Sequence, residues 1–487
     1  MPYGIHWFRR DLRVAGNPAL SANWKETKGR VLGIFFFDSA FLARPDFSAN
    51  RFAFFLETLK QLRVELRQLG SDLLVMDVGY AEAFPRLFAA LETPPHFFSY
   101  NRDYEPFART RDTGAKAWLR GKGVTVLTER DHLLIEPDEL FKPSDPTATY
   151  QVFTPFSKRW FELFSASEVQ ERVAQQRRGI VFLDKLAKGK AEKLFSLKWN
   201  EVVRDPLPGD LLEAYLAEIK KRVTISLPPA GSLAALKAVR DFKKHLAAYG
   251  EARDVPGVNG TSVLSPYFKN GSLTGAQVMA ELNLKVEPKA VKSSAGKYFT
   301  ELVWREFYYH ILFHHPRVEQ HAFLEKFAHL KWGNKPEWFT AWKEGRTGFP
   351  IVDAGMRQLK ETGWMHNRVR MIVASFLTKD LLIDWRWGER YFMEQLLDGD
   401  LAPNNGGWQW AASTGCDPQP YFRIFNPWLQ GKKFDPDGDY IKRWVPELKD
   451  TYSADLHDPP SLPRNGYPLP IVDHATQRDL ALALYKN

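Results

Sequence analysis

Cysteine is almost absent from this chain of 487 residues, which contains only Cys416. A single thiol excludes a disulfide framework and a multi-cysteine metal cluster, and it is typical of a reducing compartment. Long apolar runs are missing too: no stretch of about 18 uncharged apolar residues occurs, so we expect no membrane span. The early segment IHWFRRDLRV is charged where a signal peptide needs an apolar core. We therefore expect a cytoplasmic protein.

Several common catalytic motifs are also missing. The loop FRRDLRVAGNPAL has neither a G-x-G-x-x-G fingerprint nor a P-loop lysine, so a bound dinucleotide would not occupy the usual first-turn site. No serine-nucleophile signature is present. His310 and His314 have the spacing of two metal ligands on a helix, but Ile311 replaces the glutamate of a zincin. We predict no metal site, and we interpret Cys416 as a packing residue.

Aromatic residues, by contrast, are abundant, with 16 Trp and 35 Phe. The net charge is +9, from 67 basic and 58 acidic residues. This surplus fits a polyanionic partner or an ordinary basic enzyme, and charge alone does not separate the two. The length predicts two or three domains.

The first 130 residues predict an α/β domain. The runs GIHWF, VLGIFFFD, DLLVMDVG, HFFSYNRDY and VTVLTERD are typical of buried strands in a parallel sheet. Between the second and third runs, apolar residues recur at helical spacing from Phe52 to Leu69, and Gly70 ends the helix. We expect an open, Rossmann-like sheet of five parallel strands.

Beyond residue 130 the pattern changes twice. Residues 131–230 are rich in turn-forming segments such as RDPLPGD and SLPPAGS, and they predict a linker that carries some helix. Residues 231–487 have helical periodicity almost throughout, and they predict a larger all-α domain. One of its helices should begin near Pro350 and end at Gly363.

Three segments of the helical part suggest a binding site. KYFTELVWREFYYHILFHH places Glu301, Trp304, Arg305 and Tyr308 on one helical face, where the alternative is a surface stripe with a Glu301–Arg305 pair. WMHNRVRM places polar and apolar side chains together. Its Arg370 needs an acidic partner if it is buried, and DGDLAP offers Asp398 and Asp400. In NNGGWQWAASTG, Pro403 and two glycines predict a break in the helix that leaves peptide groups free for a ligand with polar edges, such as a flavin.

These segments carry a family resemblance. GWMHNRVRM, TELVWREFYYH, RYFMEQLLDGDLAPNNGGWQWAASTG and PYFRIFNP closely resemble the photolyase/cryptochrome family, and are most similar to its class I cyclobutane pyrimidine dimer photolyases. The similarity runs from HWFRRDLRV to about residue 450 and is weakest between 160 and 235. It implies an all-α domain that binds one U-shaped FAD, active when reduced, which accounts for the missing glycine fingerprint.

The resemblance implies a set of FAD contacts. Ser265 should cap a helix at the phosphate side, Val263 stands where many relatives have arginine, and Arg370 should pair with Asp398 or Asp400. The amide of Asn404 can accept a hydrogen bond from a reduced flavin nitrogen, and this favours repair over signalling. The implied set is Tyr249, Thr261, Ser262, Val263, Leu264, Ser265, Tyr298, Glu301, Arg305, Asn367, Arg370, Asp398, Gly399, Asp400 and Asn404.

The resemblance also implies the reaction: an electron from photoexcited, reduced FAD splits a flipped-out cyclobutane dimer in UV-damaged DNA, single- or double-stranded. Glu301, Asn367, Met371 and Asn404 are the implied catalytic residues. The protonated Glu301 would bond the carbonyl edge of the dimer, and Trp304 and Trp410 would replace its lost stacking. A single His366, in place of the histidine pair of (6-4) photolyases, favours the cyclobutane substrate.

Two further groups follow from the resemblance. Trp408, Trp385 and Trp332 match an electron-transfer chain, where the alternative is three ordinary core tryptophans. DNA should be bound mainly through phosphates, so its affinity should fall as salt rises. The implied DNA and lesion contacts are Arg253, Glu301, Trp304, Arg305, Tyr308, Arg368, Met371, Trp410, Arg423 and Gln430.

A second, light-harvesting chromophore between the domains is possible. Phe107 and Ala108 replace an Asn-Glu pair that relatives of the folate-binding type carry, and Gln320 replaces a lysine of the family. These replacements argue against folate. A deazaflavin, another flavin or an empty pocket are the alternatives that stay open. We expect a monomer without an obligatory protein partner, associated with the nucleoid in a bacterium. The alternatives are a cryptochrome-type blue-light receptor, a (6-4) photolyase and a non-photochemical flavoprotein or DNA-binding helical protein.

Overall fold

A parallel sheet forms the first part of the chain, as predicted. The computed structural model describes residues 1–145, 147–204, 211–284, 292–417, 423–460 and 462–486. The five strands lie in the order β3-β2-β1-β4-β5, and all neighbours are parallel. They are β1 (Gly4–Trp7), β2 (Val31–Phe36), β3 (Leu73–Met76), β4 (Phe97–Asn101) and β5 (Thr125–Glu129). The strand order reverses beside β1, so the loop that follows β1 opens at the switch point of the sheet.

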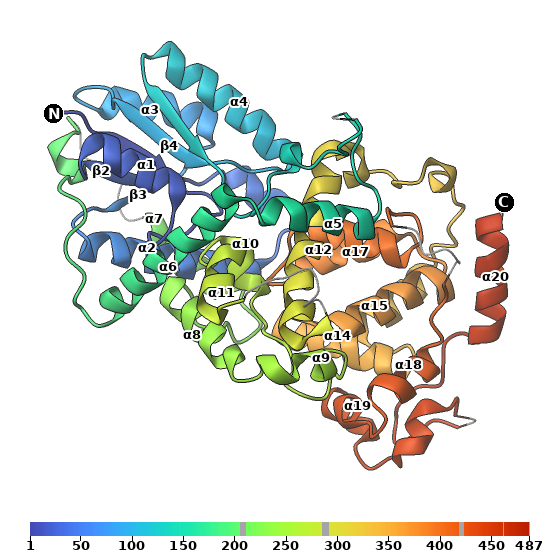
Figure 1. Ribbon diagram of the computed structural model, residues 1–487. Helices are drawn as coiled ribbons and strands as arrows, with labels where there is room; N and C mark the ends of the chain where they lie inside the picture. Colours follow the sequence, from blue (N-terminus) through green and yellow to red (C-terminus); the bar gives the residue numbers. More distant parts are fainter. Residues whose placement is uncertain (146, 205–210, 285–291, 418–422, 461, 487) are drawn as a thin grey trace.

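Helices cover both faces of this sheet (Figure 1). Alternate strand residues such as Phe35 and Val75 pack against α2, whereas Ile34 and Leu74 pack with α3 and α4. Ser48 caps α2, and Gly70, with φ +95°, follows its end as expected. The helices are α1 (Pro18–Thr27), α2 (Ala49–Gln68), α3 (Tyr80–Ala90) and α4 (Pro106–Gly121).

The connecting segment contains three helices: α5 (Phe153–Phe164), α6 (Ser167–Ala187) and α7 (Leu211–Lys220). α7 packs on α2 of the α/β part, whereas α5 and α6 pack on α12 and α11 of the helical part. The segment therefore contacts both parts of the molecule along its length. Most of the predicted RDPLPGD turn lies outside the described residues.

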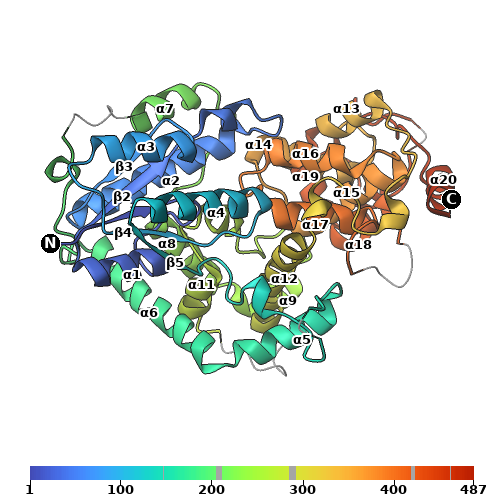
Figure 2. The same cartoon turned by 90° about the horizontal axis from the view of Figure 1, so that it is seen from above.

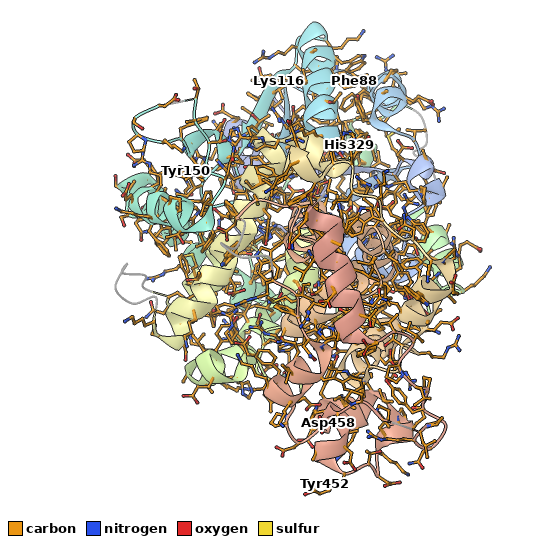
Figure 3. The ribbon with its side chains drawn as sticks, turned by 90° about the vertical axis from the view of Figure 1, so that its right-hand side faces the viewer. Phe88, Lys116, Tyr150, His329, Tyr452 and Asp458 are labelled. Atoms are coloured by element: carbon orange, nitrogen blue, oxygen red, sulfur yellow. The ribbon has the colours of Figure 1, made fainter. Side chains whose placement is uncertain are left out.

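The remaining chain is helical (Figure 2). α14 begins at Pro350 and ends before Gly363, which has φ +66°, so this prediction is confirmed. The C-terminal helix α20 lies across the outer side of the helical part, which faces the viewer in Figure 3. The helices are α8 (Ser232–Lys243), α9 (Tyr249–Ala252), α10 (Ser265–Asn270), α11 (Gly275–Leu282), α12 (Ser294–His314), α13 (Pro336–Glu344), α14 (Pro350–Thr362), α15 (Asn367–Ser375), α16 (Trp385–Gln395), α17 (Leu401–Ala411), α18 (Pro427–Phe434), α19 (Asp439–Trp444) and α20 (His474–Lys486).

The predicted helix break at Pro403 is wrong, because α17 continues from Leu401 to Ala411. Pro403 lies in the first turn, where its missing N–H has no intrahelical partner to lose. Gly406 faces α12, and a Cβ atom there would overlap the ring of Tyr308. This glycine serves close packing of two helices, and does not free peptide groups for a ligand. Among the described residues, no helix is both long and apolar enough to cross a membrane.

A buried ion pair fixes the start of the connecting segment. Arg13 in the loop after β1 is fully buried and donates to Asp131, which is nearly as buried, and to the carbonyl oxygens of Gly16 and Gly271. Because Gly271 follows α10, one guanidinium joins the sheet, the connector and the helical part.

We expect Arg13→Met to lower the free energy of unfolding by about 3–5 kcal/mol, because it leaves the carboxylate of Asp131 buried without a counter-charge. The double variant R13M/D131L removes both charges and should recover most of that loss. Urea unfolding followed by circular dichroism measures both effects. A single variant as stable as the unmodified chain would contradict this role.

Candidate functional site

The carboxylate of Asp398 joins two segments of the predicted FAD site. Arg370 Nη2 on α15 donates to Asp398 Oδ2 at 2.8 Å. This is one of the two partners predicted for Arg370. Ser265 Oγ donates to the same oxygen at 2.5 Å. Ser265 is the first residue of α10 and makes no capping hydrogen bond, so its predicted capping role is wrong. The structure uses this hydroxyl to tie the 261–265 segment to the loop before α17.

The predicted phosphate-side residues also lie together. The rings of Tyr249 and Tyr298 are 5.1 Å apart, and Tyr298 Oη donates to Ser262 Oγ at 3.1 Å. Val263 has φ +49°, a left-handed conformation that costs a β-branched residue about 1–3 kcal/mol. Leu264 is buried beneath it and Thr261 is partly exposed. The segment thus holds a strained backbone where many relatives are expected to have arginine.

Asp400 is paired with residues other than Arg370. Its carboxylate accepts from Tyr309 Oη at 2.7 Å and from Arg10 Nη2 at 3.1 Å. Lys269 Nζ lies 3.3 Å and Arg305 Nη2 3.8 Å from the same carboxylate. Burial raises the pKa of this carboxyl group, but the nearby cations more than offset it and hold the pKa far below its usual range.

Sequence reasoning missed Arg10, Lys269 and Tyr309 as partners of this site. Arg10 lies in the loop after β1, at the switch point of the sheet, and its basic neighbours were the available signal. Gly399, between the two aspartates, contacts the guanidinium of the buried Arg51 from α2. Contacts from the α/β part therefore hold the loop that precedes α17.

Glu301 is paired with Arg253, whose Nη2 lies 2.7 Å from its carboxylate. The guanidinium also lies 5.3 Å from the ring centre of Tyr249. The alternative interpretation of α12, an exposed Glu301–Arg305 pair, is not what the structure contains. Arg305 instead donates to the carbonyl oxygen of His132 and lies near Asp400.

The indole of Trp304 has one covered face. Phe153, the first residue of α5, stacks on it with ring centres 3.6 Å apart and planes inclined by 7°. Trp304 itself is partly exposed, as are Tyr308 on the next turn and Trp410 on α17. The sequence signal for Phe153 was weak because it lies in the connecting segment, far from the quoted motifs.

α15 presents further predicted contacts. Asn367 is exposed at its first turn, and Met371 packs at the edge of the large helical core. Arg368 donates to Asp254 Oδ1 at 2.8 Å and lies over the ring of Phe434. His366 precedes the helix, and burial lowers its pKa to about 4, so it is neutral at pH 7. Elsewhere, Arg423 is exposed and Gln430 on α18 is partly exposed.

The three predicted electron-transfer tryptophans share one core. Trp408 and Trp385 are buried in the helical core cluster, and Trp332 packs against it. The ring of Trp408 lies 4.9 Å from Phe392 and 6.0 Å from Trp342, a tryptophan that sequence reasoning did not single out. Their role in electron transfer stays a prediction.

Asn404 is flanked by a neutral carboxyl group. Its Nδ2 donates to the main-chain oxygen of Glu389 at 3.1 Å, which leaves Oδ1 to accept a hydrogen bond. The side chain of Glu389 accepts from Asn405 Nδ2 at 2.9 Å. Burial raises the pKa of Glu389 to about 8, so this group is mostly protonated at pH 7. Sequence reasoning missed Glu389.

The two histidines at helical spacing have other roles. His310 Nε2 accepts from the backbone of Tyr150, and His314 Nε2 bonds the carbonyl oxygen of Pro137. No group of three or more possible metal ligands occurs among the described residues. Cys416 is buried, and burial raises the pKa of its thiol to about 12, in keeping with a packing residue.

The residues present fit a flavin cofactor in the helical part. Three buried polar atoms beside the predicted contacts have no hydrogen-bond partner among the described residues: Asp398 Oδ1, His366 Nε2 and Trp408 Nε1. Such orphaned groups are costly unless a ligand or water satisfies them. Together with Oδ1 of Asn404 they offer donors and acceptors of the kind that the edge of a flavin ring requires.

A cavity of about 240 Å³ lies at the carboxyl end of β1 and β2, between the two parts of the molecule. Its lining contains both aromatic and charged side chains, and Phe107 is among them. The lining consists of Trp7, Arg9, Arg10, Phe35, Phe36, Asp38, Phe55, Tyr80, Asp103, Glu105, Phe107, Arg111 and Lys269.

Comparison with known proteins identifies the family. Residues 4–175 match the family model "DNA photolyase", and residues 298–487 match "FAD binding domain of DNA photolyase". The chain is 39% identical to the deoxyribodipyrimidine photo-lyase of Vibrio cholerae, across 99% of this chain and 98% of that protein. It therefore belongs to the DNA photolyase family.

Solved structures agree with this assignment. A bacterial class III photolyase from Agrobacterium tumefaciens is 35% identical with a TM-score of 0.82, and the match covers 100% of this chain and 97% of that one. An archaeal photolyase from Sulfolobus tokodaii, solved with two FAD molecules, is 32% identical with a TM-score of 0.79, over 99% of each chain. The class I assignment made from the sequence stays a prediction.

The raised pKa of Glu389 predicts a pH-dependent stability. Between about pH 5 and 8 the folded chain keeps a proton that the unfolded chain releases, so the free energy of unfolding should fall by up to about 1.4 kcal/mol per pH unit. Glu389→Gln keeps a neutral hydrogen-bonding group, so its stability relative to the unmodified chain should rise over this range. Thermal unfolding at several pH values measures the difference, and a constant difference would contradict the assignment.

Proposed function

We propose that this chain is a light-driven DNA repair enzyme that splits cyclobutane pyrimidine dimers, a deoxyribodipyrimidine photo-lyase by activity. The observation that carries this proposal is its likeness, over nearly its whole length, to proteins of that name. The residues that we expect to contact the lesion belong to α12, α15 and α17. When bound, reduced FAD absorbs light and supplies one electron to the dimer, which returns the electron after the ring has opened.

The chain's own residues have three tasks toward FAD. Tyr249, Ser262 and Tyr298 hold its phosphate side, together with the backbone of the 261–265 segment. Arg370 and Asp398 bind polar atoms near the ring, and Oδ1 of Asn404 accepts from a protonated ring nitrogen. The protonated carboxyl group of Glu389 adds no negative charge beside that amide, which suits an electron-rich cofactor.

The lesion side follows from the exposed side chains. A dimer that has left the duplex would stack on the free face of Trp304 and on Trp410, beside Met371. Phe153 supports this because it fixes the plane of the Trp304 indole. Glu301 would hydrogen-bond the carbonyl edge of the dimer once Arg253 turns from its carboxylate to a DNA phosphate.

The three tryptophans Trp408, Trp385 and Trp332 would pass electrons to the flavin to keep it reduced. Trp408 is buried beside α16, and Trp385 and Trp332 lie in or against the same core. Indoles in one packed core can pass an electron inward to keep the cofactor reduced. The cavity at the end of β1 would hold the second, light-harvesting chromophore, whose flat ring suits the aromatic residues of its lining.

The organisation of the chain is part of this proposal. Residues 1–130 form the antenna domain, 131–230 the linker and 231–487 the FAD-binding catalytic domain. We place the enzyme in the cytoplasm, at the nucleoid of a bacterial cell, where its substrate is found. It would act on single- or double-stranded DNA as a monomer, without an obligatory protein partner.

Light-driven repair is tested with a dimer-containing oligonucleotide under reducing conditions, with matched samples kept dark. We expect the return of intact thymines only under illumination, and no repair of a (6-4) photoproduct. Glu301→Ala should lower the repair yield by about tenfold or more, because charge that develops on the dimer loses its hydrogen-bond donor. Light-dependent reduction of the flavin without repair would instead indicate a photoreceptor.

Phe153→Leu should weaken the binding of dimer-containing single strands by about two- to tenfold, since Trp304 loses a stacked partner worth about 0.5–1.5 kcal/mol. Phe161→Leu is the control, because Phe161 lies on the same helix but packs on Trp160 and Phe299. Fluorescence anisotropy in the dark measures both affinities. Equal effects of the two changes would remove Phe153 from the site.

A further inference from the structure

Most of the net positive charge of this chain comes from two short segments. Residues 24–30 and 177–198 contain ten basic and three acidic residues, so these 29 residues carry seven of the nine net positive charges. The other 458 residues are close to neutral. A surplus placed in this way differs from the general basic character of many enzymes, and its location can be tested.

The two segments are joined in the fold. Trp24 Nε1 at the end of α1 donates to the carbonyl oxygen of Leu194 at 2.6 Å, and the amide of Ser196 donates to the carbonyl oxygen of Gly29 at 3.1 Å. The end of α6 and the chain after it therefore run beside the end of α1. Asp184, an acidic residue of this region, is already bound by Arg240 at 2.8 Å.

Six exposed lysines form this surface, which we call the α1–α6 patch. None of them has an ion-pair partner in the part of the chain that the structure describes. Some lysines elsewhere are paired instead: Lys237 and Lys244 pair with Asp241, and Lys220 pairs with Glu57. The patch consists of Lys25, Lys28, Lys185, Lys188, Lys190 and Lys193.

The predicted phosphate-binding arginines around the lesion site are, by contrast, mostly paired. Arg253 is bound to Glu301 and Arg368 to Asp254, and Arg305 lies near Asp400. Only Arg423 of the four has no carboxylate partner among the described residues. Unpaired cations such as those of the α1–α6 patch should attract a polyanion more strongly, since a paired arginine releases few counterions.

α6 connects the region of Trp304 with the α1–α6 patch. It follows α5, whose first residue stacks on Trp304, and it leads away from α12 toward the end of α1 (Figures 1 and 2). Its 21 residues span about 30 Å at 1.5 Å per residue. At about 3.4 Å per base pair, this length corresponds to about nine base pairs of duplex.

We propose that the α1–α6 patch binds the phosphates of undamaged duplex about nine base pairs or more from the lesion. The inference rests on the proposed position of the lesion beside Trp304. Exposed ammonium groups without partners suit phosphates, which they bind without reading sequence. The patch supplies affinity for the duplex arm on one side, while the paired arginines act locally at the flipped dimer.

The test compares two fourfold variants of equal net charge in dark binding experiments. K185Q/K188Q/K190Q/K193Q removes the patch, and the control K220Q/K221Q/K237Q/K244Q removes four lysines that pair with carboxylates. On a duplex with arms of about 20 base pairs, the patch variant should bind about tenfold or more weakly at physiological salt. The slope of log affinity against log salt should become shallower by up to about 3.6. The control should change little.

The length of the duplex arms distinguishes a contact at the α1–α6 patch from a general effect of lowering the net charge. With arms of about five base pairs, which end before the patch, both variants should bind like the unmodified chain. When only one arm of the duplex is long, the patch variant should lose affinity if that arm lies on the side of the patch, and should bind like the unmodified chain if it lies on the other side. The proposal is overturned if the patch variant loses affinity equally for short and long arms, or if the control variant behaves in the same way.

A separate measurement isolates the proposed function. Light-driven repair of a dimer in a short single strand, which cannot reach the patch, should proceed equally in the unmodified chain and in the patch variant. Failure of repair in the unmodified chain would refute the proposed activity. Intact repair with unchanged long-duplex affinity in the patch variant would refute only the patch.

Discussion

The buried carboxylate of Asp400 is the interaction on which the arrangement of the site depends. Removing this charge from water is costly, and the cost is offset by Arg10 from the α/β part and by Tyr309, Lys269 and Arg305 from the helical part. Asp400 is also the residue immediately before α17. The same ion cluster that joins the two parts therefore fixes the start of the helix that carries Asn404, Trp408 and Trp410.

Ion pairing also shapes how this protein can meet DNA. Carboxylates beside the proposed lesion site occupy the arginines there, so a phosphate must displace Glu301 or Asp254 to gain a contact. Exchange of one anionic partner for another gives little net affinity but makes the contact depend on the correct geometry. Free charge at the end of α6 has the opposite character, since it attracts any duplex.

The connecting segment is more than a spacer. α5 supplies the aromatic ring that backs Trp304, and α6 runs from there toward the end of α1. Glu306 on α12 accepts from the backbone of Leu134 and Ile135 and from the indole of Trp160, which joins this segment to α12. Burial raises the pKa of Glu306 to about 7, and the three donors favour its charged form.

The sequence alone determined the features that depend on local pattern. Continuous apolar runs predicted all five strands, and helical spacing predicted α2 and α14 with their ends at Gly70 and Gly363. Short motifs predicted the family and the fold. Each is a property of residues close together in the chain, where backbone sterics and side-chain periodicity act directly.

Only the tertiary structure decided which partners these residues have. Whether Arg370 pairs with Asp398 or Asp400, whether Ser265 caps a helix, and which ring covers Trp304 depend on segments up to hundreds of residues away. The role of Gly406 likewise appears only in the fold, where it lies against the ring of Tyr308. Burial and charge pairing are set by the whole fold, so the sequence could name these residues but could not assign their contacts.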